Sequence, residues 1–287
     1  MKVRLIIDST TNIPEKIRSR FTIIPLKVRF GDEEFIEGIT IDDKRFYEKL
    51  IESDVLPTTS QPSPEDFAKA YKEALEAGEE VLVITLSSKL SGTYQSAVIA
   101  AMGFPDDKIH IVDSKSVAIG TGILVQMALS MADNGMSASQ IAEVITKERE
   151  NIRLIALLDT LEYLKKGGRI SKTVAFAGGI LSIKPVICVV DGEVKLLGKA
   201  RGSKHGNNLL VQEIKAAGGV DFRKPVLLGY TGLTDALLQK YISDSVSLWE
   251  NNTDALDFAI VGSVVGTHVG PGAVAAAFFS KDSSSSF

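Results

Sequence analysis

The sequence predicts an α/β protein with two domains, an N-terminal parallel sheet flanked by helices and a C-terminal α+β domain with a mixed sheet. Three observations lead to this prediction. Short apolar runs alternate with segments of helical periodicity up to about residue 150, a pattern typical of a parallel sheet with helices on both faces. Further along, two apolar runs flank Asp191-Gly192, the signal of a hairpin with a type I′ turn and hence of antiparallel strands. The length of 287 residues also favours two domains of ordinary size.

The change of pattern sets the expected domain boundaries. We expect an N-terminal domain over residues 1–152 and a C-terminal domain over residues 153–280. Residues 281–287 contain four consecutive serines and are expected to form a disordered tail, because such a segment buries too little apolar surface to offset its ordering entropy.

Strands alternate with helices in the first half of the chain. Residues 3–7 form a β-branched run that ends at Asp8, and hydroxyl residues and Pro14 follow, as at a strand end and a helix start. Extended structure is expected at 21–30, and continuous apolar strands at 81–86 and 109–112. Helices are expected at 42–52, 65–77, 93–102, 120–134 and 137–151, with a polar loop at 57–64. Asp42 is the expected cap of the first helix, and Ser137 or Ser139 that of the last.

The second half lacks this regular alternation. A strand at 154–158 leads to a short helix at 161–166, which Gly167-Gly168 closes. The hairpin comprises 186–190 and 194–197, followed by a helix at 207–217, a strand at 226–230 and a helix at 235–241. Two more strands are expected at 258–265 and 273–279, separated by the glycine-rich loop 266–272.

Composition excludes several classes of function. The chain is 45% apolar and 24% charged, which is enough to build a sizeable core without metals or disulfides. The net charge of −4 disfavours a nucleic-acid partner, which normally requires a basic surface. The first apolar run is too short for a signal peptide, and the late apolar stretch 259–279 contains His268, Pro271 and several glycines, so no membrane-spanning segment is expected.

Cys188 is the only cysteine, and it lies within the apolar run 185–190. A single cysteine cannot form an internal disulfide, so nothing points to an oxidising compartment, and a cytoplasmic protein is predicted. We interpret Cys188 as a small buried residue of a strand rather than as a catalytic nucleophile.

Three polar loops carry residue types that bind anions. The first is the hydroxyl-rich segment 58–63. The second, 87–93, follows a predicted central strand and precedes a helix, where free N–H groups and the helix dipole favour a carboxylate or a phosphate. The third, 267–272, carries His268, one of three histidines. Serine and threonine also cap helices and Gly-Pro-Gly also forms turns, so the residues alone predict only a crevice suited to an anion.

No familiar enzyme signature accompanies these loops. The sequence lacks a dinucleotide-binding glycine motif, a Walker loop, a nucleophile elbow and the Cys/His spacing of a metal site. No metal and no organic cofactor of the protein's own is therefore predicted.

Short motifs are spread over nearly the whole chain. They are DST at 8–10, TSQPSP at 59–64, SSKLSGTYQSA at 87–97, VDS at 112–114, LEYLKKGGRIS at 161–171, KARG at 199–202 and HVGPGA at 268–273. Each is short, but in this order they resemble the DegV family of bacterial fatty-acid-binding proteins.

The resemblance implies a DegV-like fold that encloses one long-chain fatty acid between its two domains. It also implies that the chain is the binding subunit of a bacterial fatty-acid kinase rather than an enzyme by itself. In such a system a separate kinase subunit, which holds ATP and Mg²⁺, phosphorylates the bound carboxylate, and the acyl phosphate feeds phospholipid synthesis. The expected partners are then a fatty acid and the kinase subunit.

The same resemblance assigns roles to five residues. By motif match, Thr59 and Ser91 hydrogen-bond the carboxylate with the help of the Gly92 N–H, and His268 lies at the same head group. Arg169 and His268 match residues associated with phosphotransfer and with the complex with the kinase. The apolar segment 174–183 is a candidate for part of the wall around the acyl chain.

Two other functions stay open at this point. One is a stand-alone carrier that delivers a lipid or another small carboxylate to a partner other than a kinase. The other is a serine hydrolase that uses Ser91 and His268, for which no third, orienting acid can be assigned. The preferred chain length and unsaturation, the identity of the kinase, the oligomeric state and the way in which the pocket opens cannot be read from the residues.

Overall fold

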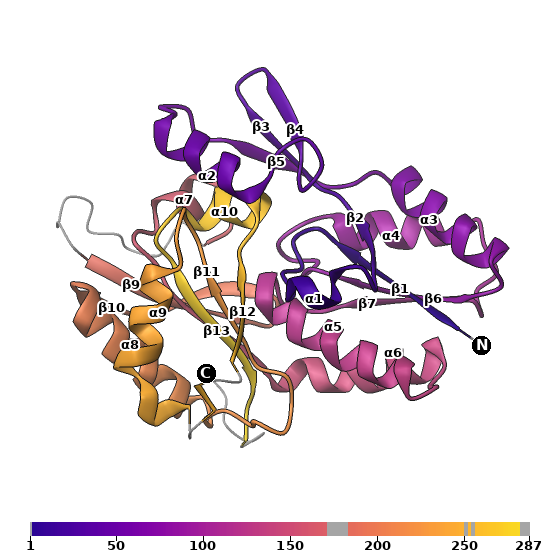
Figure 1. The fold of residues 1–287 in the computed structure, drawn as a ribbon. Helices are drawn as coiled ribbons and strands as arrows, with labels where there is room; N and C mark the ends of the chain where they lie inside the picture. The colour runs from indigo at the N-terminus through magenta and orange to yellow at the C-terminus, as the bar shows by residue number, and fades with distance from the viewer. Residues whose placement is uncertain (1, 171–182, 250–251, 254–255, 282–287) are drawn as a thin grey trace.

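A computed structural model describes residues 2–170, 183–249, 252–253 and 256–281. The strands of these residues form a four-stranded, a six-stranded and a three-stranded sheet. Figure 1 shows the two larger sheets on either side of helix α5 (Ala118–Asp133), with the small sheet above them. Of the predicted tail 281–287, only Lys281 lies within the described residues.

The N-terminal sheet is parallel throughout, in the strand order β2-β1-β6-β7. Its strands are β1 (Val3–Asp8), β2 (Thr22–Ile24), β6 (Glu80–Thr85) and β7 (Ile109–Asp113). Helices α3 (Pro64–Glu76) and α4 (Thr93–Ala101) bury apolar side chains against one face, and α5 and α6 (Ala138–Glu148) against the other. The predicted parallel sheet with helices on both faces is confirmed.

Local sequence explains how several of these helices begin. Asp42 caps α2 (Asp43–Glu52) by accepting a hydrogen bond from Arg45 N at 2.7 Å. Ser63 and Ser137 cap α3 and α6, each within a capping box. Ser137 is thus the cap of the helix predicted at 137–151, whose last turn is a 3-10 turn (Arg149–Asn151).

The C-terminal sheet is mixed, in the order β10-β9-β8-β13-β11-β12. Its strands are β8 (Ile152–Leu157), β9 (Ile183–Val190), β10 (Glu193–Arg201), β11 (Leu227–Tyr230), β12 (Asp257–Ile260) and β13 (Val274–Phe279). Helices α8 (Ser203–Ala216) and α9 (Ala236–Asp244) cover one face, and α5 covers the other. The predicted mixed sheet is confirmed, since β11 and β12 run parallel while the other strand pairs of the described sheet run antiparallel.

The predicted hairpin joins β9 to β10 through Asp191 and Gly192. Their φ angles of 51° and 82° are those of a type I′ turn, which is the turn predicted for this Asp-Gly pair. β10 continues to Arg201, beyond the predicted end at 197. The turn contacts the N-terminal half of the chain, because the Ser87 hydroxyl donates a hydrogen bond to the Gly192 carbonyl oxygen at 2.8 Å.

The third sheet is antiparallel and consists of β3 (Lys27–Phe30), β4 (Glu33–Ile36) and β5 (Thr58–Ser60). The prediction of a loop over 57–64 was wrong for β5, which pairs with β3. The side chains of β5 are all polar, so no apolar alternation marks it as a strand. Shorter helices are α1 (Glu15–Arg18) and α7 (Glu162–Lys166), with a 3-10 turn at Val246–Leu248.

The segment 258–265 was predicted as one strand, and this prediction was wrong. β12 ends at Ile260, and helix α10 (Ser263–Val269) occupies most of what was predicted as the end of the strand and the following loop. The first turn of α10 is held by Glu37, whose carboxylate accepts a hydrogen bond from Val264 N. An apolar run fits both a strand and a buried helix, and a partner this distant in the sequence is invisible to local analysis.

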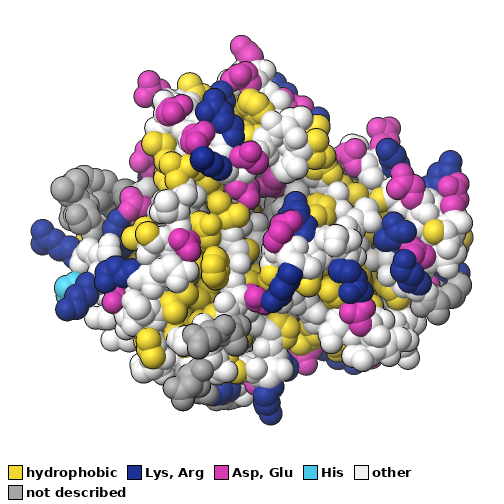
Figure 2. Space-filling model, in the orientation of Figure 1, with side chains coloured by type: hydrophobic (Ala, Val, Ile, Leu, Met, Phe, Trp, Pro, Cys, Tyr) yellow, Lys and Arg dark blue, Asp and Glu magenta, His cyan; other side chains and the backbone are white. Residues whose placement is uncertain are grey.

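Figure 2 shows acidic and basic side chains interspersed over the visible face, without a basic stripe. Within the described ranges, no helix combines the length and the apolar character that crossing a bilayer requires.

Candidate functional site

A cavity of about 330 Å³ lies where the three sheets meet. The loops after β1 and β6 line it, together with β5, α10 and strands of the mixed sheet. Small-molecule sites have volumes of about 300–1,000 Å³. Open sheets bind ligands at the carboxyl ends of their parallel strands, and the loops after β1 and β6 lie at this edge.

Asp8 organises the loops at this edge. Its buried carboxylate accepts hydrogen bonds from Leu86 N at 2.7 Å, from Thr10 N at 3.0 Å and from the Thr10 hydroxyl. Burial raises the pKa of Asp8 above its ordinary value, although these bonds favour the ionised form. Asp8 therefore ties the end of β6 to the end of β1 and places Thr10 in the cavity wall.

Ser91 and Gly92 precede helix α4, and both line the cavity. The Ser91 hydroxyl accepts a hydrogen bond from Thr93 N at 3.3 Å and lies 2.9 Å from the buried Thr93 hydroxyl. When Thr93 donates to Ser91, the Ser91 proton is available to a ligand. Within the described part of the chain, the Gly92 N–H has no hydrogen-bond acceptor, and it lies at the positive end of the helix dipole. This end of α4 therefore offers an anion two donors.

Thr59 and His268 are in contact at the cavity mouth, although 209 positions separate them in the sequence. Thr59 belongs to β5 and His268 to α10, and Thr59 Oγ1 lies 3.0 Å from His268 Nε2. When the imidazole carries its proton on Nε2, it donates to Thr59, and the threonine proton is available to a ligand. The contact between His268 and Thr59 thus leaves the Thr59 hydroxyl free to donate a hydrogen bond into the cavity.

His268 is held neutral by its surroundings. Burial, and then the nearby Arg169 cation, lower the pKa of the imidazole to about 4. The other ring nitrogen, Nδ1, is buried and has no partner among the described residues. It faces Gly167, where a Cβ atom would lie 2.2 Å from Nδ1, so only glycine leaves room for the ring in this position.

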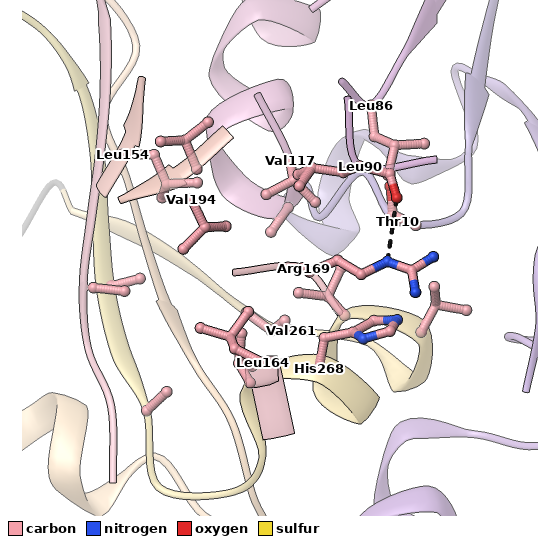
Figure 3. Close-up of a pocket in the computed structure, with 18 of the residues that line it drawn as sticks. Thr10, Leu86, Leu90, Val117, Leu154, Leu164, Arg169, Val194, Val261 and His268 are labelled. Atoms are coloured by element: carbon pink, nitrogen blue, oxygen red, sulfur yellow. Dashed lines mark hydrogen bonds between the residues drawn. The ribbon is translucent and has the colours of Figure 1, made fainter. Parts of the chain in front are cut away.

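Arg169 follows helix α7 and lines the same mouth. Its Nε donates to the Leu90 carbonyl oxygen at 3.3 Å, and its Nη1 donates to the Gly167 carbonyl oxygen at 2.6 Å. No carboxylate among the described residues forms an ion pair with Arg169. Figure 3 shows the Arg169 and His268 side chains at one end of the cavity, and Leu154 and Val194 at the other. The cation is therefore available to an anionic ligand.

The interior of the cavity is apolar. Its wall includes Leu154, Ala156, Val194 and Ala275, which come from the mixed sheet and face α5 residues such as Ile119. Cys188 of β9 borders the cavity, but its side chain packs on the other face of the mixed sheet, with Leu210 and Ile214 of α8.

Cys188 is buried in its strand, as predicted, and burial raises the pKa of its thiol to about 12. At neutral pH the thiol is therefore protonated and a poor nucleophile.

The five predicted site residues thus line one cavity, although they come from four separate parts of the chain. Sequence reasoning missed Gln61, which also lines it and whose amide nitrogen donates to the Ser96 hydroxyl at 3.0 Å. Its position in the TSQPSP motif was the only signal. Of the predicted wall segment 174–183, only Ile183, the first residue of β9, lies within the described residues.

A polar mouth with an apolar interior suits an amphiphile with an anionic head. The dyad of a serine hydrolase is not formed among the described residues, because Ser91 pairs with Thr93 and His268 with Thr59. The described ranges also contain no cluster of His, Cys, Asp or Glu that fits a metal ion.

Comparison with known proteins places this cavity in context. A family model described as "Uncharacterised protein, DegV family" matches residues 2–281. A DegV domain-containing protein of Caldanaerobacter subterraneus subsp. tengcongensis is 33% identical over 284 residues, which cover 98% of this chain and 99% of the relative.

Two solved structures are similar over nearly their whole length. A DegV family protein from Thermus thermophilus, described by its fatty acid binding, is 32% identical, with a TM-score of 0.86 over 97% of this chain and 100% of that one. A stearic acid-binding protein from Eubacterium ventriosum is 25% identical, with a TM-score of 0.84 over 97% of this chain and 98% of the other.

Proposed function

The chain belongs to the DegV family, and we propose that it binds one long-chain fatty acid, with the carboxylate at the cavity mouth and the acyl chain in the apolar interior. The observation that carries this proposal is the division of one cavity into a donor-rich mouth and an apolar wall. The fatty-acid-binding relatives of the same fold support it.

The carboxylate is assigned to the donors around Thr59 and Ser91. A buried carboxylate is costly unless it is hydrogen-bonded, and two hydroxyls together with the Gly92 N–H supply the bonds. His268 orients Thr59 through their 3.0 Å contact and stays neutral, so it adds no buried charge. Arg169 supplies the favourable cation at the rim.

The acyl chain provides most of the affinity. Each buried methylene contributes about 0.8 kcal/mol, so roughly fifteen of them contribute on the order of 12 kcal/mol before ordering costs. A ligand bound so tightly is expected to remain with the protein through purification.

The same proposal extends to a partner. We assign the chain as the non-catalytic, cytoplasmic subunit that presents the carboxylate to a separate ATP-dependent kinase for acyl-phosphate formation and phospholipid synthesis. The sequence has no nucleotide-binding loop of its own, so ATP and Mg²⁺ belong to the kinase. Arg169 and His268 line the cavity mouth, and we assign them to the phosphoryl group that the kinase would transfer there, whose charge Arg169 would neutralise.

The proposed domains are 1–152 and 153–280, with the ligand between them. Every strand of the parallel sheet and of the small sheet comes from the first range, and all but the first residue of the strands of the mixed sheet come from the second. The cavity is lined from both ranges, which supports this placement of the ligand.

Mass spectrometry of organic extracts tests the proposal. Wild-type protein should release a stoichiometric fatty acid, and Thr59→Ala and Ser91→Ala should bind it about ten- to a hundredfold more weakly, because each loses a hydrogen bond to a charged group. Thr58→Ala and Ser88→Ala are the matched controls, since these exposed neighbours do not line the cavity. Empty wild-type protein that takes up no added fatty acid would refute the proposal. Retained fatty acid without acyl phosphate in the presence of a kinase subunit would leave a stand-alone carrier.

A further inference from the structure

Glu37 is a buried carboxyl group outside the cavity just described. It follows β4, and its backbone N–H donates to the Leu26 carbonyl oxygen at 3.0 Å. Its side chain extends to helix α10, and only 6% of the residue's surface is exposed. No basic side chain among the described residues forms an ion pair with it. Burying a carboxyl group without an ion pair costs free energy, so the hydrogen bonds that Glu37 accepts must offset this cost.

The two oxygens of Glu37 join three segments. Oε2 accepts a hydrogen bond from the Ser9 hydroxyl at 2.5 Å, and Ser9 Oγ in turn accepts one from Leu26 N at 2.9 Å. Oε1 accepts from Val264 N at 2.8 Å and from the Ser263 hydroxyl at 3.1 Å. The carboxyl group therefore connects the loop after β1, the start of the small sheet and the first turn of α10.

The backbone before α10 is shaped to receive this carboxyl group. A Cβ atom on Gly262 would lie 2.6 Å from Glu37 Oε1, so the approach depends on glycine at this position. Immediately upstream, the Val261 carbonyl oxygen accepts a hydrogen bond from the Tyr47 hydroxyl at 2.7 Å. Helix α2 and Glu37 thus fix the start of α10 from two sides.

The end of the same short helix carries His268, which contacts Thr59. All three anchors of α10, namely Tyr47, Glu37 and Thr59, lie between β4 and β5 or in β5 itself. A shift at the first turn of so short a helix moves its last turn as well. The position of the imidazole at the cavity mouth therefore depends on how the helix is held at Glu37.

We propose that Glu37 is a positioning residue for His268: by holding the first turn of α10, it sets the contact between His268 and Thr59. The contact lies within the protein itself, and only its consequence for fatty-acid release rests on the function proposed above.

The electrostatic surroundings make this support sensitive to pH. Burial raises the pKa of Glu37 to about 7; the donors Ser9, Val264 and Ser263 oppose the rise, and Asp43 adds to it. A second cavity beside Glu37 is lined by the other titratable and charged groups of this region, and Tyr47 packs next to them. These groups are Glu15 and Arg18 of α1, Asp42 and Asp43 at the start of α2, and Tyr230 of β11.

The direction of the pH effect follows from linkage. When α10 lifts away, Glu37 meets water and its pKa returns toward the ordinary value of 4.5. Glu37 then binds a proton more tightly when α10 is in place than when α10 has moved away. The in-place position of α10 is therefore favoured at low pH, and this preference weakens as the pH rises toward and past 7. Protonated Glu37 accordingly holds the helix better than ionised Glu37.

The first experiment observes the imidazole rings by NMR, without any ligand. The chain has three histidines, so His110 and His205 serve as internal references. In Glu37→Ala, the pKa of His268 should rise from about 4 toward its ordinary value of 6.5, while the spectra of the two reference rings should match those of the wild type. Glu37→Gln keeps an oxygen for Val264 N and Ser263 and should leave His268 as in the wild type.

Glu79→Ala is the matched control. Glu79 is also a buried carboxylate, but it pairs with Lys2 and Arg4 at the far end of β1. Its loss should lower stability without changing the titration of His268. If Glu37→Ala fails to fold, Glu37→Asp gives the same test, because its shorter side chain keeps the charge but cannot reach both Ser9 and α10. An unchanged His268 titration in a folded Glu37→Ala or Glu37→Asp variant would overturn the proposal.

The second experiment measures release of a fluorescent fatty acid across pH. The rate from wild-type protein should rise about tenfold between about pH 6 and about pH 8.5, as the pKa difference of Glu37 requires. Glu37→Gln should show no such rise, and it also corrects for ionisation of the ligand. Equal pH dependence in both proteins would contradict the coupling. If wild-type protein binds no fatty acid, the function proposed above fails, while the NMR experiment still decides the role of Glu37.

Discussion

At the cavity mouth, each polar side chain is held by a neutral partner. Thr59 pairs with His268, Ser91 pairs with Thr93, and the guanidinium of Arg169 donates to backbone carbonyl oxygens. None of these partners is a carboxylate, so the mouth keeps a positive charge and several donors for a ligand. Charge-assisted hydrogen bonds to an anion are roughly twice as strong as neutral ones, which favours a carboxylate over a neutral head group here.

Arg169→Ala should separate binding from phosphotransfer. The donors around Thr59 and Ser91 remain, so fatty-acid retention should fall only severalfold, whereas acyl-phosphate formation with the kinase should fall about a hundredfold. Extraction and mass spectrometry measure retention, and a coupled ATP assay measures the product. Lys166→Ala is the control, because this exposed lysine of the preceding helix pairs with Glu162. Equal losses of both activities would argue against the division of roles.

The residues of this site differ in how far the sequence reveals them. Ser91 and Gly92 could be inferred in part from local sequence, because hydroxyl and glycine residues before a helix form an anion site. The contact of Thr59 with His268 spans 209 positions, and no local pattern contains it. Residue types pointed to the loops that carry Thr59 and His268, but only resemblance to a family gave these two residues their roles and brought Arg169 into the prediction.

Among the elements, those whose ends are fixed by neighbouring residues were predicted well. The hairpin turn at Asp191-Gly192 and the caps at Asp42 and Ser137 are local features, and each lies where the sequence placed it. β5 and α10 were predicted wrongly, because each depends on a distant partner. β5 is defined by pairing with β3, and the first turn of α10 is defined by Glu37.

Ser137→Ala should destabilise the fold without affecting the ligand. The Ser137 hydroxyl accepts from Gln140 N at 3.3 Å at the start of α6, remote from the cavity lining. Loss of such a cap lowers the free energy of unfolding by about 1 kcal/mol. Urea denaturation measures the change. Ser139→Ala, an exposed position in the first turn of the same helix, should leave the stability within about 0.5 kcal/mol of the wild type, and a larger loss there would undermine the capping argument.

For the whole molecule, helix α5 joins the two larger sheets. Its buried residues pack in one apolar cluster with Leu5 and Leu82 of the parallel sheet and with Leu154 and Ala277 of the mixed sheet. The proposed domains therefore share a core as well as a cavity. Sequence periodicity predicted the helix, but a helix that is apolar around most of its circumference gives no sign of which two surfaces it joins.

The shared core should make unfolding a single transition. Trp249 is the only tryptophan and is buried in the C-terminal half, so its fluorescence reports on that half alone. Far-UV circular dichroism reports on all helices and strands. Because the cluster around α5 spans both sheets, the two signals should share one urea midpoint. Separate midpoints would show that the two halves unfold independently.

The position of Cys188 makes its thiol a reporter of opening in the C-terminal half. The chain carries one cysteine, and its buried side chain packs with Leu210 and Ile214 on the face of the mixed sheet that α8 covers. A small uncharged alkylating reagent reaches this thiol when α8 and the sheet come apart. The rate of alkylation therefore measures that opening directly, without a label, and a single adduct mass distinguishes molecules that have opened from molecules that have not.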